Sequence, residues 1–120
     1  MKKLLIFLLL VACSEKNSVS SLSPLEFDQK LKNTPNAVLI DVRSAAEVAE
    51  GSLSNARNIV YDDSFASKIS ELPKDQPTFL YCAAGKRSAK AAAILEEAGF
   101  KKVYQLNGGL KAWKEAKLPL

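Results

Sequence analysis

The chain contains no histidine among its 120 residues. Imidazole has an ordinary pKa near neutral pH, which makes it the usual general base of enzymes and a frequent ligand of zinc. Its absence excludes every mechanism that needs imidazole as general base and every histidine-ligated metal site. Chemistry in this chain must therefore rest on other side chains.

The sequence also lacks a strong excess of one charge. Lys and Arg number 17 against 13 Asp and Glu, a formal charge of +4, and Lys2 and Lys3 stand in a segment that we expect to be removed. The other lysines are scattered, which is typical of solvated helix faces, so we expect no nucleic-acid partner. A composition of 48% apolar and 25% charged residues indicates one compact globular domain.

Long hydrophobic runs are missing as well. The run from Leu4 to Val11 is too short to span a bilayer, which takes about 20 residues, but it fits the apolar part of a secretory signal. It ends in Leu10-Val11-Ala12-Cys13, which resembles the lipobox of bacterial lipoproteins. The resemblance implies a lipoprotein signal peptide over residues 1–12, cleavage after Ala12 and a lipid on Cys13.

The implied lipid predicts a membrane anchor in the bacterial cell envelope, on the periplasmic side. Ser14 after the lipidated cysteine favours the outer membrane, by analogy with known lipoproteins. An ordinary signal peptide, or an N-terminal anchor, is the alternative, and Cys13 then has no role.

Cysteine is scarce, with only Cys13 and Cys82 present. If Cys13 carries a lipid, Cys82 is an unpaired thiol in an oxidising compartment, which marks it as a candidate reactive group. A Cys13–Cys82 disulfide is the alternative.

Apolar runs typical of buried strands alternate with amphipathic segments typical of helices. Capping boxes begin two of the helices, at Ser23–Glu26 and Ser44–Glu47. This alternation predicts an α/β domain over residues 23–120, with a mainly parallel central sheet and helices on both faces. A flexible polar tether is expected over residues 13–22. The expected strands cover 37–40, 58–60, 78–81 and 103–106, and the later helices cover 65–72, 88–98 and 110–116.

The chemistry is concentrated in a short loop, Cys82-Ala83-Ala84-Gly85-Lys86-Arg87, between the strand at 78–81 and the helix expected from Ser88. Ligands of parallel α/β sheets bind at the carboxyl ends of the strands. A helix N-terminus, a nest of N–H groups permitted by Gly85 and two cations should lower the pKa of Cys82 and suit an anion. Cys82 is therefore the candidate nucleophile. The alternative is a small buried side chain without chemistry.

Five segments together resemble single-domain rhodaneses, which are sulfurtransferase modules. They stand in the order of that family and span roughly residues 23–120. The tethered form is similar to small periplasmic rhodaneses, including the phage-shock kind. The segments are 39–43 (Leu-Ile-Asp-Val-Arg), Glu47 with Gly51, 81–89 around Cys82, 98–100 (Ala-Gly-Phe), and 106–113 (Leu-Asn-Gly-Gly-Leu-Lys-Ala-Trp).

The resemblance implies a rhodanese-like fold and thiosulfate sulfurtransferase activity. Cys82 would take the outer sulfur of a small anionic donor such as thiosulfate, hold it as a persulfide, and pass it to cyanide or a thiol. No metal or organic cofactor is needed, and we expect a monomer. By resemblance the donor is bound by Ala83, Ala84, Gly85, Lys86, Arg87 and Ser88.

Other residues are expected to serve the fold. Asp41 and Arg43 should contact the residues that line the loop or serve the fold alone. We expect Arg43 to form an ion pair with Glu47. Trp113 should belong to the core. Where the family often reads Gly-His-Ile-x-Gly-Ala, residues 51–56 read Gly-Ser-Leu-Ser-Asn-Ala, so the resemblance does not predict the turn there.

Three other functions stay open. A cysteine phosphatase or arsenate reductase needs five residues between Cys and Arg to wrap an oxyanion, whereas four separate Cys82 from Arg87. A non-catalytic binding module on the same fold has usually lost the cysteine. A thiol redox protein needs a resolving cysteine, and the loop has none.

Overall fold

The computed structural model describes residues 18–120. The predicted signal peptide, the predicted lipidation of Cys13 and residues 13–17 of the predicted tether lie outside this range. None of the helices formed by residues 18–120 combines the length and apolar character needed to cross a membrane.

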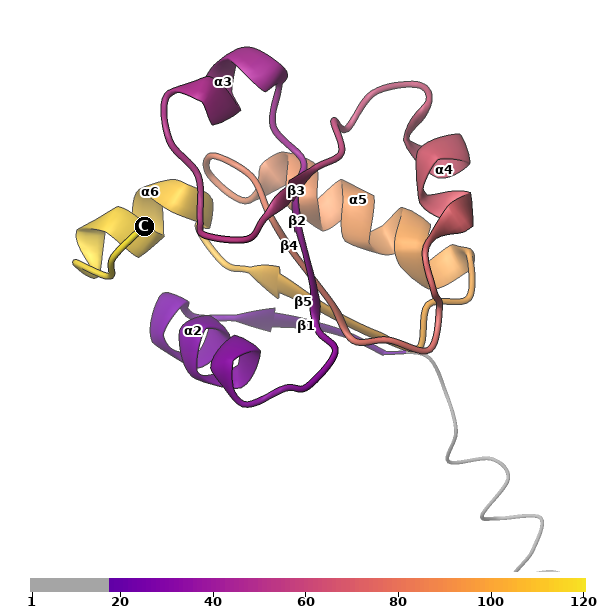
Figure 1. The fold of residues 1–120 in the computed structure, drawn as a ribbon, viewed down its shortest axis with the longest axis horizontal. Coiled ribbons are helices and arrows are strands. Elements are labelled where there is room, and N and C mark those ends of the chain that lie inside the picture. The colour runs from indigo at the N-terminus through magenta and orange to yellow at the C-terminus, as the bar shows by residue number, and fades with distance from the viewer. Residues whose placement is uncertain (1–17) are drawn as a thin grey trace, which may run out of the picture.

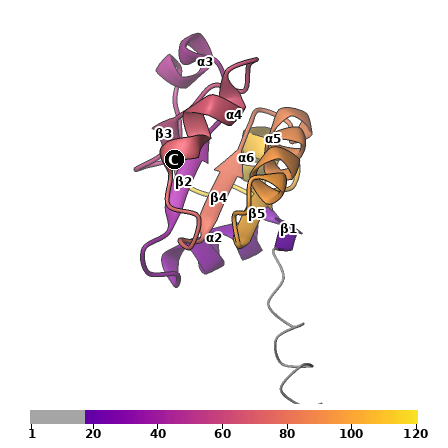
Figure 2. The same cartoon turned by 90° about the vertical axis from the view of Figure 1, so that its right-hand side faces the viewer.

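Five strands form one sheet in the order β1-β5-β4-β2-β3, and every neighbouring pair is parallel. Figure 2 shows the strands side by side in this order. The predicted α/β class with a parallel central sheet is confirmed. The strands are β1 (Ser18–Leu22), β2 (Val38–Asp41), β3 (Arg57–Asn58), β4 (Thr78–Tyr81) and β5 (Lys102–Leu106).

Helices cover both faces of the sheet, as predicted. Figure 1 shows α4 and α5 on one side and α2 and α6 on the other, with α3 beyond the carboxyl end of β2. The helices are α2 (Pro24–Lys32), α3 (Ala45–Ala49), α4 (Phe65–Lys68), the 3-10 helix η1 (Ile69–Glu71), α5 (Lys86–Glu97) and α6 (Gly109–Glu115).

Both predicted capping boxes are present. The N–H of Glu26 donates to Ser23 Oγ and the N–H of Ser23 donates to Glu26 Oε1, at 3.3 and 3.1 Å. Ser44 and Glu47 exchange the same two bonds at the start of α3. Each box satisfies two N–H groups that the helix leaves without an internal partner, which fixes where the helix begins.

The tether predicted over 13–22 is wrong for Ser18–Leu22, which form the edge strand β1. This strand pairs with β5 in register from Ser18 opposite Lys102 to Leu22 opposite Leu106. Most of its side chains are exposed and three of its five are serines, so no hydrophobic pattern marks it. Backbone hydrogen bonds to β5, rather than apolar burial, hold it in place.

Element boundaries differ from the prediction at several places. Helix α5 begins at Lys86, two residues earlier than expected, and the helix expected over 65–72 is divided into α4 and η1. The strand expected over 58–60 is the shorter β3. The earlier start of α5 matters most, because it brings the helix N-terminus directly onto the loop that follows Cys82.

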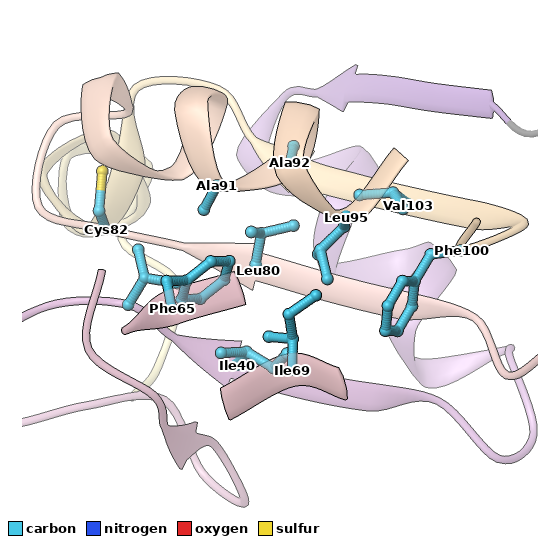
Figure 3. Close-up of a cluster of buried hydrophobic side chains, with 11 residues drawn as sticks. Ile40, Phe65, Ile69, Leu80, Cys82, Ala91, Ala92, Leu95, Phe100 and Val103 are labelled. Carbon is cyan, nitrogen blue, oxygen red and sulfur yellow. The ribbon is translucent and has the colours of Figure 1, made fainter. Parts of the chain in front are cut away.

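Two hydrophobic cores flank the sheet. One lies under α4, η1 and α5 and includes Ile40, Leu80 and Leu95, and Cys82 lies at its end (Figure 3). The other lies under α2 and α6, where Trp113 is 3% exposed and its ring meets the ring of Phe27 edge-on at 6.3 Å. The predicted core role of Trp113 is confirmed.

Candidate active site

Cys82 directly follows β4, the central strand, whose four residues are all buried. The residue is itself 1% exposed. In Figure 3 its sulfur points away from the apolar cluster toward the first turn of α5. The thiol therefore forms the floor of the loop at the carboxyl end of the sheet, where ligands of this fold class bind.

The loop folds so that its N–H groups point at the sulfur. Gly85 and Ser88 donate their N–H groups to Cys82 Sγ at 3.0 and 3.3 Å. Gly85 has a φ of +101°, which glycine adopts without strain, and this conformation leads straight into α5. The positive end of that helix adds to the attraction for a charged sulfur.

The pKa of Cys82 reflects two opposed effects. Burial raises it, because a charged sulfur loses contact with water. The hydrogen bond with the Ser88 side chain, and those from the N–H groups of Ser88, Gly85 and Ala84, lower it. The hydrogen bonds prevail, so the pKa of the Cys82 thiol lies below its ordinary value.

This direction gives a first testable result. The rate at which iodoacetamide alkylates Cys82 should follow the thiolate fraction and fall only when the pH drops below the lowered pKa. We therefore expect the midpoint of the rate–pH profile at a lower pH than for a cysteine in an unfolded peptide of the same sequence. A midpoint at or above that of the peptide would contradict the assigned hydrogen bonds.

The beginning of α6 holds the loop from the other side. The N–H groups of Leu110 and Lys111 donate to the carbonyl oxygens of Cys82 and Ala83 at 2.8 and 2.9 Å. A Cβ atom on Gly109 would lie 2.6 Å from the Ala83 carbonyl and from the N of Ala84. Gly109 is therefore needed for α6 to approach the loop this closely.

Arg87 is paired with a carboxylate. Its guanidinium donates two hydrogen bonds to the carboxylate of Glu47, at 2.8 and 2.9 Å. This bidentate bond is the largest cause of a lowered pKa of Glu47, and the hydrogen bond from the N–H of Ser44 is the next. Together they bring the pKa of Glu47 to about 2. Glu47 thus caps α3 and also fixes Arg87, whereas Lys86 beside it is exposed.

Arg43 does not pair with the carboxylate of Glu47, so that prediction is wrong. Its Nε and Nη2 donate to the Asp41 carboxylate at 3.0 and 2.7 Å, and Asp41 is fully buried. Nη2 also donates to the carbonyl of Gly51 at 2.6 Å, and Nη1 to the backbone carbonyl of Glu47 at 3.4 Å. The Asp41–Arg43 pair therefore braces the segment around α3. The Arg43 guanidinium also lies over the ring of Tyr81, the residue before Cys82, at 5.8 Å from the ring centroid.

The segment that departs from the family pattern is held by other bonds. The N–H of Leu53 donates to the hydroxyl of Tyr81 at 2.9 Å, and Arg43 binds the carbonyl of Gly51. Leu53 is buried among the side chains under α2 and α6. This turn is thus fixed by the end of β4 next to Cys82.

The six residues predicted to bind the donor occupy different environments. Ala84 and Lys86 are exposed, Ala83, Gly85 and Arg87 are half-buried, and Ser88 is buried. Ser88 contacts the sulfur itself, with its Oγ 3.4 Å from Cys82 Sγ. It therefore belongs to the floor of the site rather than to its mouth.

The roles of two residues near Cys82 were not predicted from the sequence. Glu47 was expected as a helix cap and a partner of Arg43, and Gln105 was not singled out. Gln105 is a buried polar residue of β5, and its Oε1 accepts from Ser88 Oγ at 2.6 Å. Its one signal in the sequence is an amide side chain between Tyr104 and Leu106 in β5.

Cys82 is a free thiol, and no group of three His, Cys, Asp or Glu side chains among residues 18–120 is arranged to hold a metal. A cavity of about 560 Å³ lies between α2, the turn at 53–55 and the last residues of the chain. None of its lining residues belongs to the Cys82 loop.

Known proteins share this architecture. A protein-family model described as the rhodanese-like domain matches residues 23–116. A sulfurtransferase from Allochromatium vinosum is 33% identical over 102 residues, 85% of this chain and 94% of that protein. The thiosulfate sulfurtransferase GlpE of Pseudomonas putida is 35% identical over 91 residues, 76% of this chain and 82% of that protein. The crystal structure of a rhodanese-related protein from Thermoplasma volcanium matches with a TM-score of 0.74 at 28% identity, covering 83% of this chain and 95% of that one. The chain belongs to the rhodanese-like domain family, as its sequence pattern predicted.

Proposed function

We propose that this protein is a sulfurtransferase that moves a sulfane sulfur from a small anionic donor, thiosulfate or a similar compound, to a thiophilic acceptor through a persulfide on Cys82. The observation that carries the proposal is the Cys82 sulfur itself. It lies on the floor of the loop, receives N–H groups from Gly85 and Ser88, and has a lowered pKa.

In the first step the Cys82 thiolate attacks the outer sulfur of thiosulfate. A sulfur–sulfur bond forms on Cys82, the bond within thiosulfate breaks, and sulfite leaves with the electron pair of that bond. The negative charge that thiosulfate brought to its outer sulfur stays on the persulfide. The N–H groups of the loop that bind the thiolate are placed to stabilise this charge as well.

In the second step a nucleophilic acceptor attacks the outer sulfur of the persulfide. With cyanide, a carbon–sulfur bond forms, the sulfur–sulfur bond breaks and its electrons return to Cys82 as thiolate, so thiocyanate leaves. A thiol acceptor takes the sulfur in the same way and becomes a persulfide. No external oxidant or reductant is consumed, and no proton has to be carried by an imidazole.

The loop suits a slender donor. Cys82 is 1% exposed at the bottom of a loop with only four residues between it and Arg87, so a single sulfur atom reaches it more readily than a phosphate ester. Among the neighbouring cations Lys86 is exposed, while the charge of Arg87 is balanced by Glu47. The relative from Pseudomonas putida is named for thiosulfate, which agrees with an anionic donor.

Replacing Glu47 by glutamine is expected to lower the KM for thiosulfate. Glutamine keeps the cap of α3 but removes the charge that balances Arg87, so the cation becomes available to the donor. We expect the KM for thiosulfate to fall about two- to fivefold, the size of a partly exposed charge effect. Glu50→Gln removes the same charge from the exposed end of α3 and is the matched control. An unchanged KM in Glu47→Gln, or an equal fall in Glu50→Gln, would show that Arg87 does not meet the donor.

The proposed function is tested by comparing two activities of the purified protein. With thiosulfate and cyanide we expect steady formation of thiocyanate, and with an aryl phosphate no release of phosphate above background. Phosphate release without thiocyanate formation would favour a cysteine phosphatase. Absence of both activities, together with a lack of sulfur exchange with thiols, would favour a binding module.

We propose further that a lipid on Cys13 anchors the domain to the bacterial cell envelope on its periplasmic side. The support is the sequence Leu10-Val11-Ala12-Cys13 after a short apolar run. Incorporation of a labelled fatty acid that is lost in Cys13→Ser is the expected result, and equal labelling of both forms would contradict it.

A further inference from the structure

A chain of polar side chains leads from the sulfur of Cys82 to the outer edge of the sheet. Ser88 Oγ lies 3.4 Å from Cys82 Sγ and 2.6 Å from Gln105 Oε1, and Gln105 Nε2 lies 3.0 Å from Ser21 Oγ. Ser88 is fully buried and Gln105 is 7% exposed, while Ser21 on β1 is exposed. Neither Gln105 nor Ser21 takes part in the sulfur transfer described above.

The direction in which these hydrogen bonds are donated depends on the hydroxyl proton of Ser88. The short contact of 2.6 Å directs the hydroxyl proton of Ser88 to Gln105 Oε1. Ser88 can then only accept a hydrogen bond from Cys82, which suits a neutral S–H group. A thiolate or persulfide anion has no proton to give. It would face the lone pairs of Ser88, an unfavourable contact in a buried site.

The amide of Gln105 can remove this conflict. Its two ends have nearly the same shape and opposite hydrogen-bonding roles. Turned over, it donates from Nε2 to Ser88 Oγ and accepts at Oε1 from the hydroxyl of Ser21. The proton of Ser88 is then free to point at the sulfur. Each member of the chain keeps a partner in both arrangements. With a thiol at Cys82 every hydrogen bond is donated toward Ser21, and with an anion every hydrogen bond is donated toward the sulfur.

We propose that Gln105 is a positioning residue for the sulfur site, and that by reversing its amide it turns the hydroxyl of Ser88 toward Cys82 whenever the sulfur is negatively charged. A glutamate at this place would accept at both oxygens and hold the proton away from the sulfur. A methionine of similar length would offer no hydrogen bond to Ser88. The benefit of this switch to catalysis rests on the proposed sulfur transfer. The Cys82 thiolate itself forms in the protein without any sulfur donor.

Charged groups around Cys82 also affect how readily the thiolate forms. Lys86 and Arg87 stand at the start of α5, Arg87 is paired with Glu47 of α3, and Asp41 of β2 is paired with Arg43. The side-chain hydrogen bonds of Gln105 within residues 18–120 go to Ser88 and Ser21. Replacing Gln105 by an uncharged residue therefore leaves these charges in place.

The first test is a double-mutant comparison. In Gln105→Met Ser88 loses the N–H group of the turned amide that holds its hydroxyl toward the sulfur. The proton of Ser88 is then shared between the sulfur and the carbonyl of Gly85, 3.3 Å away. We expect the pKa of Cys82, measured from thiolate absorbance or alkylation rate against pH, to rise by about half a pH unit or more, the worth of one neutral hydrogen bond. In the Ser88→Ala background the same replacement should cause no shift. An equal pKa in wild type and Gln105→Met, or a shift that persists without Ser88, would overturn the proposal.

The second test uses the protein with Gln105 in place, so it does not depend on the folding of a Gln105 variant. The side-chain amide resonances of isotope-labelled Gln105 should titrate with the pKa of Cys82 in the wild-type protein and stay constant in Ser88→Ala, where the same charge still forms. Equal titration in both proteins would mean that the field of the charge, not a turned amide, moves the resonances, and the proposal fails. Neither test uses a sulfur donor, so its outcome is separate from the outcome for sulfur transfer.

Discussion

Replacing Cys82 by serine is expected to abolish sulfur transfer, with a loss of at least about a thousandfold in thiocyanate formation, because the attacking group itself is removed. A serine hydroxyl is not ionised near neutral pH, and its oxygen does not form a stable bond to sulfane sulfur. The N–H groups of Gly85 and Ser88 can donate to the serine oxygen as they do to the sulfur. The fold should therefore survive with a loss of about 1 kcal/mol in unfolding free energy.

The matched control for this variant is the other cysteine. Cys13→Ser changes a residue outside the rhodanese-like domain of residues 23–116, so the purified protein should transfer sulfur at the wild-type rate. Thermal unfolding of all three forms shows whether any loss of activity reflects loss of structure. Retained turnover in folded Cys82→Ser, or an equal loss in Cys13→Ser, would remove Cys82 from the mechanism.

Gly109→Ala is expected to destabilise the domain and to disrupt the loop at the same time. The new Cβ would lie 2.6 Å from the carbonyl carbon and oxygen of Ala83 and from the N of Ala84. The φ of Gly109 is +64°, a conformation that costs alanine energy as well. We expect a loss of roughly 2–4 kcal/mol in unfolding free energy, from overpacking against rigid backbone and from the positive φ. We also expect more than about a tenfold fall in activity, because the loop holds the N–H groups that stabilise the sulfur.

Gly99→Ala separates the two causes. Gly99 also has a positive φ, +95°, but the atom nearest to its added Cβ is Lys74 Cδ at 3.9 Å. This variant should lose only about 1 kcal/mol from backbone strain and keep its activity. If chemical denaturation gave both variants the same loss, and both kept full activity, close packing of α6 on the loop would not be what requires Gly109.

The sequence predicted the fold where apolar burial decides it. Runs such as 78–81 are buried on both faces of the sheet and alternate with capped helices, so α/β order is visible without the structure. Strand β1 could not be predicted, because an edge strand rich in serine is selected by backbone pairing with β5 rather than by side-chain burial. Its place in the sheet depends on a partner more than 80 residues away in the chain.

The candidate site shows the same division between local and distant determinants. Cys82, Gly85 and the start of α5 lie within a few residues of one another, so the sequence alone indicates a reactive thiol at a helix N-terminus. The partners that tune the site come from elsewhere. Glu47 meets Arg87 across 40 positions, and Gln105 reaches Ser88 across 17.

Strand register explains why Gln105 lies beside the loop. In the pairing of β4 with β5, Gln105 stands opposite Leu80, two residues before Cys82. A shift of one residue in this register would turn the amide to the other face of the sheet and away from Ser88. The sequence predicts both strands but not their register, so contacts that depend on register had to come from the structure.

The proposed function depends on sulfur being held covalently by Cys82, and the intact mass of the protein tests this most directly. The reduced wild-type protein is incubated with thiosulfate, freed of small molecules and weighed, then treated with cyanide and weighed again. We predict a gain of the mass of one sulfur atom, located on the peptide that contains Cys82, and its complete loss with cyanide as thiocyanate appears. No gain in mass, or the same gain in Cys82→Ser, would contradict the persulfide and the function built on it.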